Sequence, residues 1–175
     1  MFVTVCAIIV GAMVRRIRPH DLLDIGDLAS WIGIAAVVMG LLLRTWAAAV
    51  LEKGSVLATQ GPYQICRHPL YVGSFLVVLG YCTLLGDWLS ATALFTAVLL
   101  TYPFAIIREE ERMLAAFGDD WKHHSRKTFR FLPGEFPRSW GPISLAKWLR
   151  NREYKALLTG LGGLCLIEFW RWLSW

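Results

Sequence analysis

An apolar run from Leu28 to Leu51, interrupted by one charge at Arg44, most constrains what this chain can fold into. About 20 such residues suffice for a helix to cross the hydrocarbon core of a bilayer. The composition agrees: 56% of the residues are hydrophobic, 18% are charged and the mean hydropathy is +0.48, which soluble domains rarely combine. Within the run, Gly33 and Gly40 predict close packing against another helix. We predict an all-α integral membrane protein with a single domain, residues 1–175.

Further apolar segments bring the prediction to about five transmembrane helices. The segments 70–85 and 89–107 are joined by the short connection Gly86-Asp87-Trp88, so we expect them to form a helical hairpin at the core of the fold. Residues 2–14 are short for a span, and whether they fully cross the membrane stays open. Besides 28–51, the apolar segments are 2–14, 70–85, 89–107 and 156–173.

The polar region 108–155 predicts how the chain is oriented, because it holds more than half of the 18 Lys and Arg residues. Basic segments next to membrane helices stay on the cytoplasmic side. A hairpin returns the chain to the face that it left, so segment 52–69 lies on the cytoplasmic face too. We expect a protein of the plasma (inner) membrane with its functional face in the cytoplasm. If residues 2–14 cross the membrane, this orientation places three basic residues on the opposite side, against the rule that basic segments stay cytoplasmic. These residues are Arg15, Arg16 and Arg18.

The net charge of +5 comes mainly from this one region, so it indicates an anionic lipid surface rather than nucleic acid as the partner. The four cysteines are scattered without C-x-x-C spacing, which argues against a zinc site and a disulfide framework. We therefore expect membrane lipids as partners, no nucleic acid and no metal. The beginning of the chain shows neither a basic stretch nor a cleavage site, so we expect no removed signal peptide. The sequence does not predict an oligomeric state.

Tryptophans and one amphipathic segment predict where the chain meets the lipid headgroups. Residues 144–154 place Leu145, Trp148 and Leu149 on one helical face and basic side chains on the other, which is typical of a helix lying in the interface. Amphipathic indole rings at the ends of apolar runs prefer the same depth. The predicted anchors are Trp31, Trp88, Trp170, Trp172 and Trp175.

The acidic run after the hairpin continues its second helix beyond the apolar part. Helical spacing places Glu110 on an apolar face, where a carboxylate needs a cationic partner or a ligand because desolvating an unpaired charge is costly. Both roles stay open for Glu110, with Arg67 or Arg112 as the internal partner. Taken alone, Glu109 and Glu111 fit ordinary solvated residues. The companions of Glu110 on its face are Ile106, Met113, Leu114 and Phe117.

The segment Arg67-His68-Pro69 stands where the first helix of the hairpin begins. Proline suits the first helical turn, so Arg67 and His68 precede a helix N-terminus at the membrane surface. Alone, they fit a snorkelling arginine and a capping histidine. Together with Glu110 at the same membrane face they form a mixed-charge pocket at headgroup depth. Ionisable groups in such a place indicate a functional site.

These motifs together resemble the isoprenylcysteine carboxyl methyltransferase and phospholipid methyltransferase family of integral membrane enzymes. The ordered set lies within 61–133, and we take 52–133 as the motif-bearing core, followed by the interfacial helix near 144–154 and a C-terminal transmembrane helix, 156–173. The matching residues are Gly61-x-Tyr63-x-x-x-Arg67-His68-Pro69-x-Tyr71-x-Gly73, then Glu109-Glu110 with Leu114 and Phe117-Gly118, then Arg130-Phe131-Leu132-Pro133.

The resemblance implies S-adenosylmethionine as the methyl donor, bound in a pocket that faces the cytosol. By the resemblance, Glu110, with Glu109 beside it, receives the methionyl ammonium, while Arg67 and Arg130 hold an anionic group of the donor or of a substrate. Trp121 stands where the family often has a tyrosine, which leaves the substrate side open. The residues implied in donor binding are Tyr63, His68, Pro69, Tyr71, Gly73, Glu109, Glu110 and Arg130.

Methyl transfer from a sulfonium mainly requires alignment of donor and acceptor and exclusion of water. A carboxylate acceptor needs no base, whereas an amine acceptor must lose a proton, for which His124 ranks before His123 and His68. Like Trp121, His124 replaces a frequent tyrosine of the family. We predict Arg67 and His124 as the catalytic residues.

Three functions follow as alternatives from this reading. The leading one is methyl transfer from S-adenosylmethionine to a lipophilic acceptor, either a carboxylate of the isoprenylcysteine kind or a lipid amine. The second is an NADPH-dependent membrane reductase of the steroid reductase kind, and the third is a catalytically silent membrane scaffold. Binding of S-adenosylmethionine, of NADPH or of neither distinguishes them. The sequence does not identify the acceptor.

Overall fold

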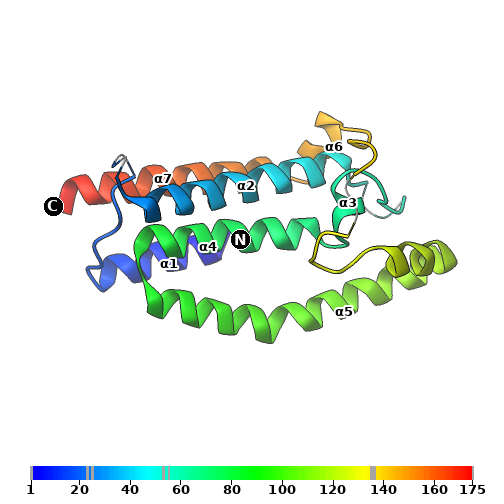
Figure 1. The fold of residues 1–175 in the computed structure, drawn as a ribbon, viewed down its shortest axis with the longest axis horizontal. Coiled ribbons are helices and arrows are strands. Elements are labelled where there is room, and N and C mark those ends of the chain that lie inside the picture. Colours follow the sequence, from blue (N-terminus) through cyan, green and yellow to red (C-terminus); the bar gives the residue numbers. More distant parts are fainter. Residues whose placement is uncertain are drawn as a thin grey trace.

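The computed structural model describes residues 2–22, 24, 26–52, 54, 56–134 and 137–174, and its regular structure there is entirely helical. Figure 1 shows α1, α2, α4 and α7 as an elongated bundle, with α5 running along one side and α3 and α6 at one end. The helices are α1 (Phe2–Val14), α2 (Leu28–Val50), α3 (Pro62–Ile65), α4 (Pro69–Leu85), α5 (Trp88–Lys127), α6 (Leu145–Arg150) and α7 (Tyr154–Ser174).

Among the described residues, three helices are long and apolar enough to cross a membrane: α2, Ala91–Lys127 of α5 and Tyr154–Leu173 of α7. The helices α1 and α4 are apolar but shorter, so five spans remain a prediction. The helix α5 spans 40 residues but is interrupted at Gly118, whose backbone is not helical (φ 53°, ψ −119°). Its first part, residues 88–117, is about 45 Å long, well beyond the hydrocarbon thickness of a bilayer. The apolar part ends at Ile107, so we expect the part from Arg108 onward to lie outside the hydrocarbon.

The closest helix pair is α2 with α4, and not the predicted hairpin of α4 with α5. The tight turn is confirmed, since α4 ends at Gly86 in the left-handed conformation (φ 62°, ψ 20°) and α5 begins two residues later. Beyond the turn α5 diverges from α4 (Figure 1). Glycines on both helices allow α2 and α4 to pack this closely. A Cβ on Gly40 would lie 2.6 Å from the carbonyl oxygen of Gly73, and one on Gly80 would lie 2.6 Å from that of Gly33.

We expect Gly40→Ala to lower the free energy of unfolding by about 1–3 kcal/mol, because the added methyl group has no room between α2 and α4. Thermal unfolding of the detergent-purified protein measures the effect. Gly162→Ala on α7 is the matched control, since a Cβ there meets nothing within 4 Å. A loss as large for Gly162→Ala as for Gly40→Ala would contradict the close crossing.

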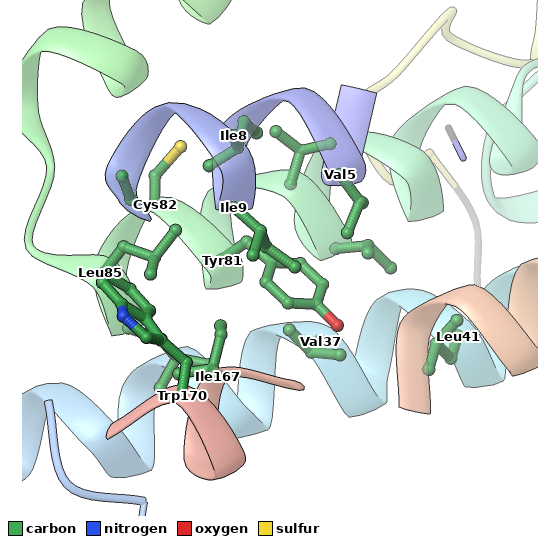
Figure 2. Close-up of a cluster of buried hydrophobic side chains, with 14 residues drawn as sticks. Val5, Ile8, Ile9, Val37, Leu41, Tyr81, Cys82, Leu85, Ile167 and Trp170 are labelled. Carbon is green, nitrogen blue, oxygen red and sulfur yellow. The ribbon is translucent and has the colours of Figure 1, made fainter. Parts of the chain in front are cut away.

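The core joins four helices that lie far apart in the sequence (Figure 2). It includes Val5 and Ile9 of α1, Val37 of α2, Tyr81 of α4 and Ile167 of α7. Trp170 also belongs to this core and is 9% exposed, so its prediction as an interface anchor was wrong. The helical face of α7 that carries Ile167 also carries Trp170, three residues on. Trp31, Trp88 and Trp172 are exposed, as expected of anchors, and Trp175 lies outside the described residues.

The arginines after α1 lie at the end of the bundle opposite to α3 and α6. There, Arg15 forms an ion pair with the buried Asp87 of the α4–α5 turn. At the same end, Asp21 pairs with Arg171 of α7 at 3.1 Å. The orientation rule counts Lys and Arg residues whether or not they are paired, so these ion pairs leave the departure of the three arginines unexplained.

Candidate active site

The entry to α4 is fixed by the loop that follows α5. The Arg67 backbone N–H donates to the carbonyl of Phe129 at 2.8 Å, and that of His68 donates to the carbonyl of Arg130 at 3.2 Å. Pro69 then starts α4. Two segments that sequence reasoning placed at one membrane face are thus joined by backbone hydrogen bonds.

Glu110 is the centre of an ionic cluster between these segments. Its Oε1 accepts from Arg67 Nη1 at 2.7 Å and from Arg130 Nε at 3.1 Å, and its Oε2 accepts from Arg130 Nη2 at 2.7 Å. His68 Nε2 lies 3.4 Å from Oε1. The side chain of Glu110 is 14% exposed. Internal pairing with Arg67, one of the two roles left open by the sequence, is therefore present, and Arg130 adds a second, bidentate partner.

This cluster keeps Glu110 ionised. Burial by itself would raise the pKa of Glu110, but hydrogen bonds from Arg130 and the charge of Arg67 outweigh it and lower that pKa below its ordinary value. The same contacts raise the pKa of Arg130. Glu110 thus works as a clamp that holds the α4 entry and the loop after α5 to α5.

A cavity of about 650 Å³ opens beside the clamp, a size typical of small-molecule sites. Glu109 lines it, whereas Glu110 does not. The linker between α2 and α3 forms a further part of its wall through Glu52 and its neighbours. The other polar and aromatic lining residues are Tyr63, Arg67, His68, Tyr71, Arg108, Arg112, Phe117, Trp121 and His124.

Glu109 is the carboxylate that this cavity offers to a ligand. It is 37% exposed and its Oε2 lies 4.0 Å from His68 Nδ1. Burial and the nearby charge of Glu109 raise the pKa of Tyr71 to about 12. Among the described residues no arginine forms an ion pair with Glu109, in contrast to Glu110. A half-open carboxylate beside aromatic rings suits a cationic group.

Two polar atoms of the site are buried without a hydrogen-bond partner among the described residues: the Tyr63 hydroxyl and Arg67 Nε. Tyr63 is 8% exposed and lines the cavity. Burial raises the pKa of Tyr63, so its hydroxyl stays protonated. Leaving such groups unpaired costs free energy. Their arrangement fits a ligand that carries polar groups of its own.

The histidines of the cavity are held neutral. Burial lowers the pKa of His124, and the charges of Arg67 and His123 add to this effect. Burial also lowers the pKa of His68, against the opposing influence of Glu109 and Glu110. A neutral imidazole at physiological pH can accept a proton.

We expect the free energy of unfolding to fall as the pH falls through 6.5, the ordinary pKa of histidine. At that pH the His124 imidazole binds a proton in the unfolded chain but not in the folded protein. His124→Gln should make this decline shallower. His123→Gln, which removes only the smallest contribution to the lowered pKa of His124, should change it much less. Thermal unfolding between about pH 8 and pH 5 measures both slopes. Equal slopes in wild type and His124→Gln would contradict the burial of His124.

A second cavity of about 450 Å³ lies where α5 diverges from α4. Its wall is almost entirely apolar, and Arg130 is the charged residue in it. Tyr71 lines both cavities and packs edge-on against Tyr102 and His68, with ring centroids 5.1 Å and 5.7 Å apart. Tyr71 thus separates the first, polar cavity from the second, apolar cavity.

Comparison with known proteins gives the family. The sequence pattern of phospholipid methyltransferases matches residues 28–120, which is more than half of the chain. The chain belongs to the phospholipid methyltransferase family. The resemblance that the motifs indicated is thereby confirmed.

Several proteins with different described functions are similar in sequence to this chain. It is 36% identical over 104 residues to the cobalt-zinc-cadmium resistance protein CzcN of Cupriavidus metallidurans, which covers 58% of the chain and 48% of the relative. It is 37% identical over 87 residues to the protein-S-isoprenylcysteine O-methyltransferase of Schizosaccharomyces pombe, covering 49% of the chain and 36% of the relative. The 7-dehydrocholesterol reductase of Xenopus laevis is 33% identical over 84 residues, covering 47% and 18%. The chain thus spans about half the length, or less, of these relatives. No solved structure matches it.

Most of the site residues predicted from the sequence line the first cavity, and three lie elsewhere. Glu110 forms the clamp, Arg130 reaches the second cavity, and Gly73 faces α2, where a Cβ would lie 2.6 Å from Arg44 Cγ. The missing side chain of Gly73 thus allows close helix packing, and its assignment to the donor pocket stays a prediction. The predicted residues that line the first cavity are Tyr63, Arg67, His68, Pro69, Tyr71, Glu109 and His124.

Three lining residues of the first cavity on α5 were not predicted as site residues. Arg112, Met113 and Phe117 follow Glu109 at spacings of three, four and eight residues, which is one helical stripe. Met113 and Phe117 were expected on the face of Glu110, and counting the same spacing from Glu109 adds Arg112. The α2–α3 linker gives no such signal.

Proposed function

We propose that this chain transfers a methyl group from S-adenosylmethionine to a lipophilic acceptor at the membrane interface. The observation that carries the proposal is the half-open carboxylate of Glu109 in a cavity with unpaired Tyr63 and Arg67 donor atoms. Membership in the phospholipid methyltransferase family supports it.

The residues of the first cavity fit such a donor. Glu109 suits the methionyl ammonium, and the Tyr63 hydroxyl and Arg67 Nε suit the carboxylate or ribose oxygens. Phe117 and Trp121 offer apolar and aromatic surface for a purine ring. When bound, the donor supplies a methyl group on a sulfonium, which passes to the acceptor in a single displacement.

The chain's own groups have two tasks in this reaction. The cavity walls align the reactants and exclude water, which favours transfer between groups whose charges disappear together. For an amine acceptor, neutral His124 accepts the proton that the nitrogen releases, whereas a carboxylate acceptor releases none. Arg67 is bound to Glu110 through Nη1 and still presents its unpaired Nε, so it holds an anionic group without leaving the clamp.

The second cavity is the place we assign to the acceptor. Its wall of Phe75, Phe95 and Val98 matches an apolar chain, and the shared residue Tyr71 puts it next to the donor cavity. An acceptor from the lipid phase fits this arrangement. The basic region 108–155 supports a cytoplasmic site, and the bacterial relative supports the inner membrane.

A membrane reductase is the second candidate, and the match to 7-dehydrocholesterol reductase favours it. In that case the first cavity takes NADPH, and its Arg108 and Arg112 serve the phosphates.

Calorimetric titration of the detergent-purified protein tests the proposal. We expect binding of S-adenosylmethionine and S-adenosylhomocysteine, and none of NADPH. Binding of NADPH alone would select the reductase. Binding of neither by folded protein would favour a silent scaffold.

A further inference from the structure

The segment from Trp140 to α6 presents an apolar surface to the outside of the bundle. Trp140, Ile143, Leu145 and Leu149 are each at least half exposed, and we call these four residues with Lys147 and Arg150 the α6 surface. The helix lies at the same end of the bundle as α3, next to the start of the membrane helix α7 (Figure 1). Because it adjoins the start of a membrane helix, its expected depth is that of the lipid headgroups.

The charge of this segment is one-sided. Between residues 140 and 155 the basic residues are Lys147, Arg150, Arg152 and Lys155, and the acidic residue is Glu153. Glu153 is 4% exposed and forms a bidentate pair with Arg44 inside the bundle. The outward charge of the segment is thus positive, and combined with exposed apolar side chains it is complementary to an anionic leaflet.

Glu52 links the α6 surface to the first cavity. Lys147 Nζ lies 3.0 Å from Glu52 Oε2, and Arg150 Nη2 lies 3.8 Å from Oε1. Glu52 itself lines the cavity as part of the α2–α3 linker. The Glu52 side chain is 35% exposed, so these pairs are partly screened and weak. Two basic groups of the α6 surface therefore also hold part of the cavity wall.

We propose that the α6 surface binds anionic phospholipid headgroups, which compete with Glu52 for Lys147 and Arg150 and so release the α2–α3 linker from α6. Ligand exchange at the first cavity then becomes faster in an anionic membrane. Hydrogen bonds from Asn151 Nδ2 to the carbonyls of Ala48 and Leu51 keep α6 on the end of α2 meanwhile. The binding of lipid stands on the α6 surface alone, whereas the effect on exchange rests on the proposed function.

Hydrogen exchange of the full chain tests lipid binding without any cofactor. The protein is compared in nanodiscs of phosphatidylcholine and in nanodiscs that also contain phosphatidylglycerol. We expect phosphatidylglycerol to slow exchange in residues 144–152 of the wild type and to have no such effect in the double variant Lys147→Gln/Arg150→Gln. Equal exchange of the wild type in both membranes would overturn the proposal.

The dissociation rate of S-adenosylmethionine in the same nanodiscs tests the link to the cavity. We expect phosphatidylglycerol to raise this rate about fivefold in the wild type, the gain typical of one basic side chain near an anionic leaflet. Glu52→Gln and the double variant should show the high rate in both membranes. Lys122→Gln, which alters an exposed pair with Asp119, is the control for general surface charge and should respond as the wild type does.

The outcomes separate the two proposals. Slower exchange at 144–152 with a constant dissociation rate would overturn the link to the cavity and keep the lipid surface. Absence of S-adenosylmethionine binding in every membrane would overturn the proposed function and the link that depends on it, while the hydrogen-exchange result still decides the lipid surface. A Lys122→Gln variant that loses the lipid response would refute the specific role of Lys147 and Arg150.

Discussion

Glu109→Gln is expected to weaken S-adenosylmethionine binding by at least about 30-fold while leaving the thermal stability near that of the wild type, because truncating one partner of a desolvated charge pair costs about 2 kcal/mol or more. Glu109 faces the cavity and holds no arginine of the clamp. Its removal therefore costs the ligand a partner and costs the fold little. Calorimetry and thermal unfolding on the same preparation measure the two effects.

Glu110→Gln is the comparison that gives the result its meaning. It removes the charge that holds Arg67 and Arg130, and we expect it to lower the free energy of unfolding by about 1–3 kcal/mol, since Arg130 is half exposed and its share is screened. Binding should weaken less than in Glu109→Gln. Glu111 is exposed on the same turn, so Glu111→Gln is the control that changes neither quantity. Loss of binding in Glu110→Gln at unchanged stability, with binding retained in Glu109→Gln, would restore the role that the family resemblance implied for Glu110.

The choice between these two carboxylates shows where sequence reasoning reaches its limit. Helical spacing correctly placed Glu110 on an inward face and named Arg67 as a partner. It could not show that Arg130, twenty residues on, would fold back and satisfy the remaining oxygen. Adjacent residues on a helix lie about 100° apart, so a small rotation of α5 decides which carboxylate meets the cavity. That rotation depends on tertiary contacts of the loop after α5.

The helices themselves were predictable because long apolar runs leave the backbone in lipid little choice but a helix. Which helices pack against each other was not predictable in the same way. In a membrane, an apolar face gains little by meeting another apolar face rather than lipid, so close packing of small residues decides which helices pair. Gly33 and Gly40 gave that signal for α2, but the hairpin turn suggested α5 as the partner of α4. The reciprocal glycines Gly73 and Gly80 on α4 show why α2 prevailed.

Breaking the Arg44–Glu153 pair is expected to have the largest effect on stability. Arg44 lies within the membrane helix α2, where a charge is costly unless it is paired. Its Nε and Nη2 bond Glu153 at 2.6 Å and 3.0 Å, and its Nη1 reaches the Leu70 carbonyl at 3.2 Å and Ser74 Oγ at 2.5 Å. One side chain thus ties α2 to α4 and to the segment that enters α7.

Glu153→Gln should lower the free energy of unfolding by about 3–5 kcal/mol, because it leaves the mostly buried arginine charged and without a counter-charge. The double variant Arg44→Met/Glu153→Leu should recover most of this loss, since it removes both charges and keeps the volume. Unfolding of the purified protein measures both. A double variant as unstable as Glu153→Gln would mean that the bonds from Arg44 to Leu70 and Ser74, rather than the compensation of charge, hold α2, α4 and α7 together at the end of the bundle that carries the site.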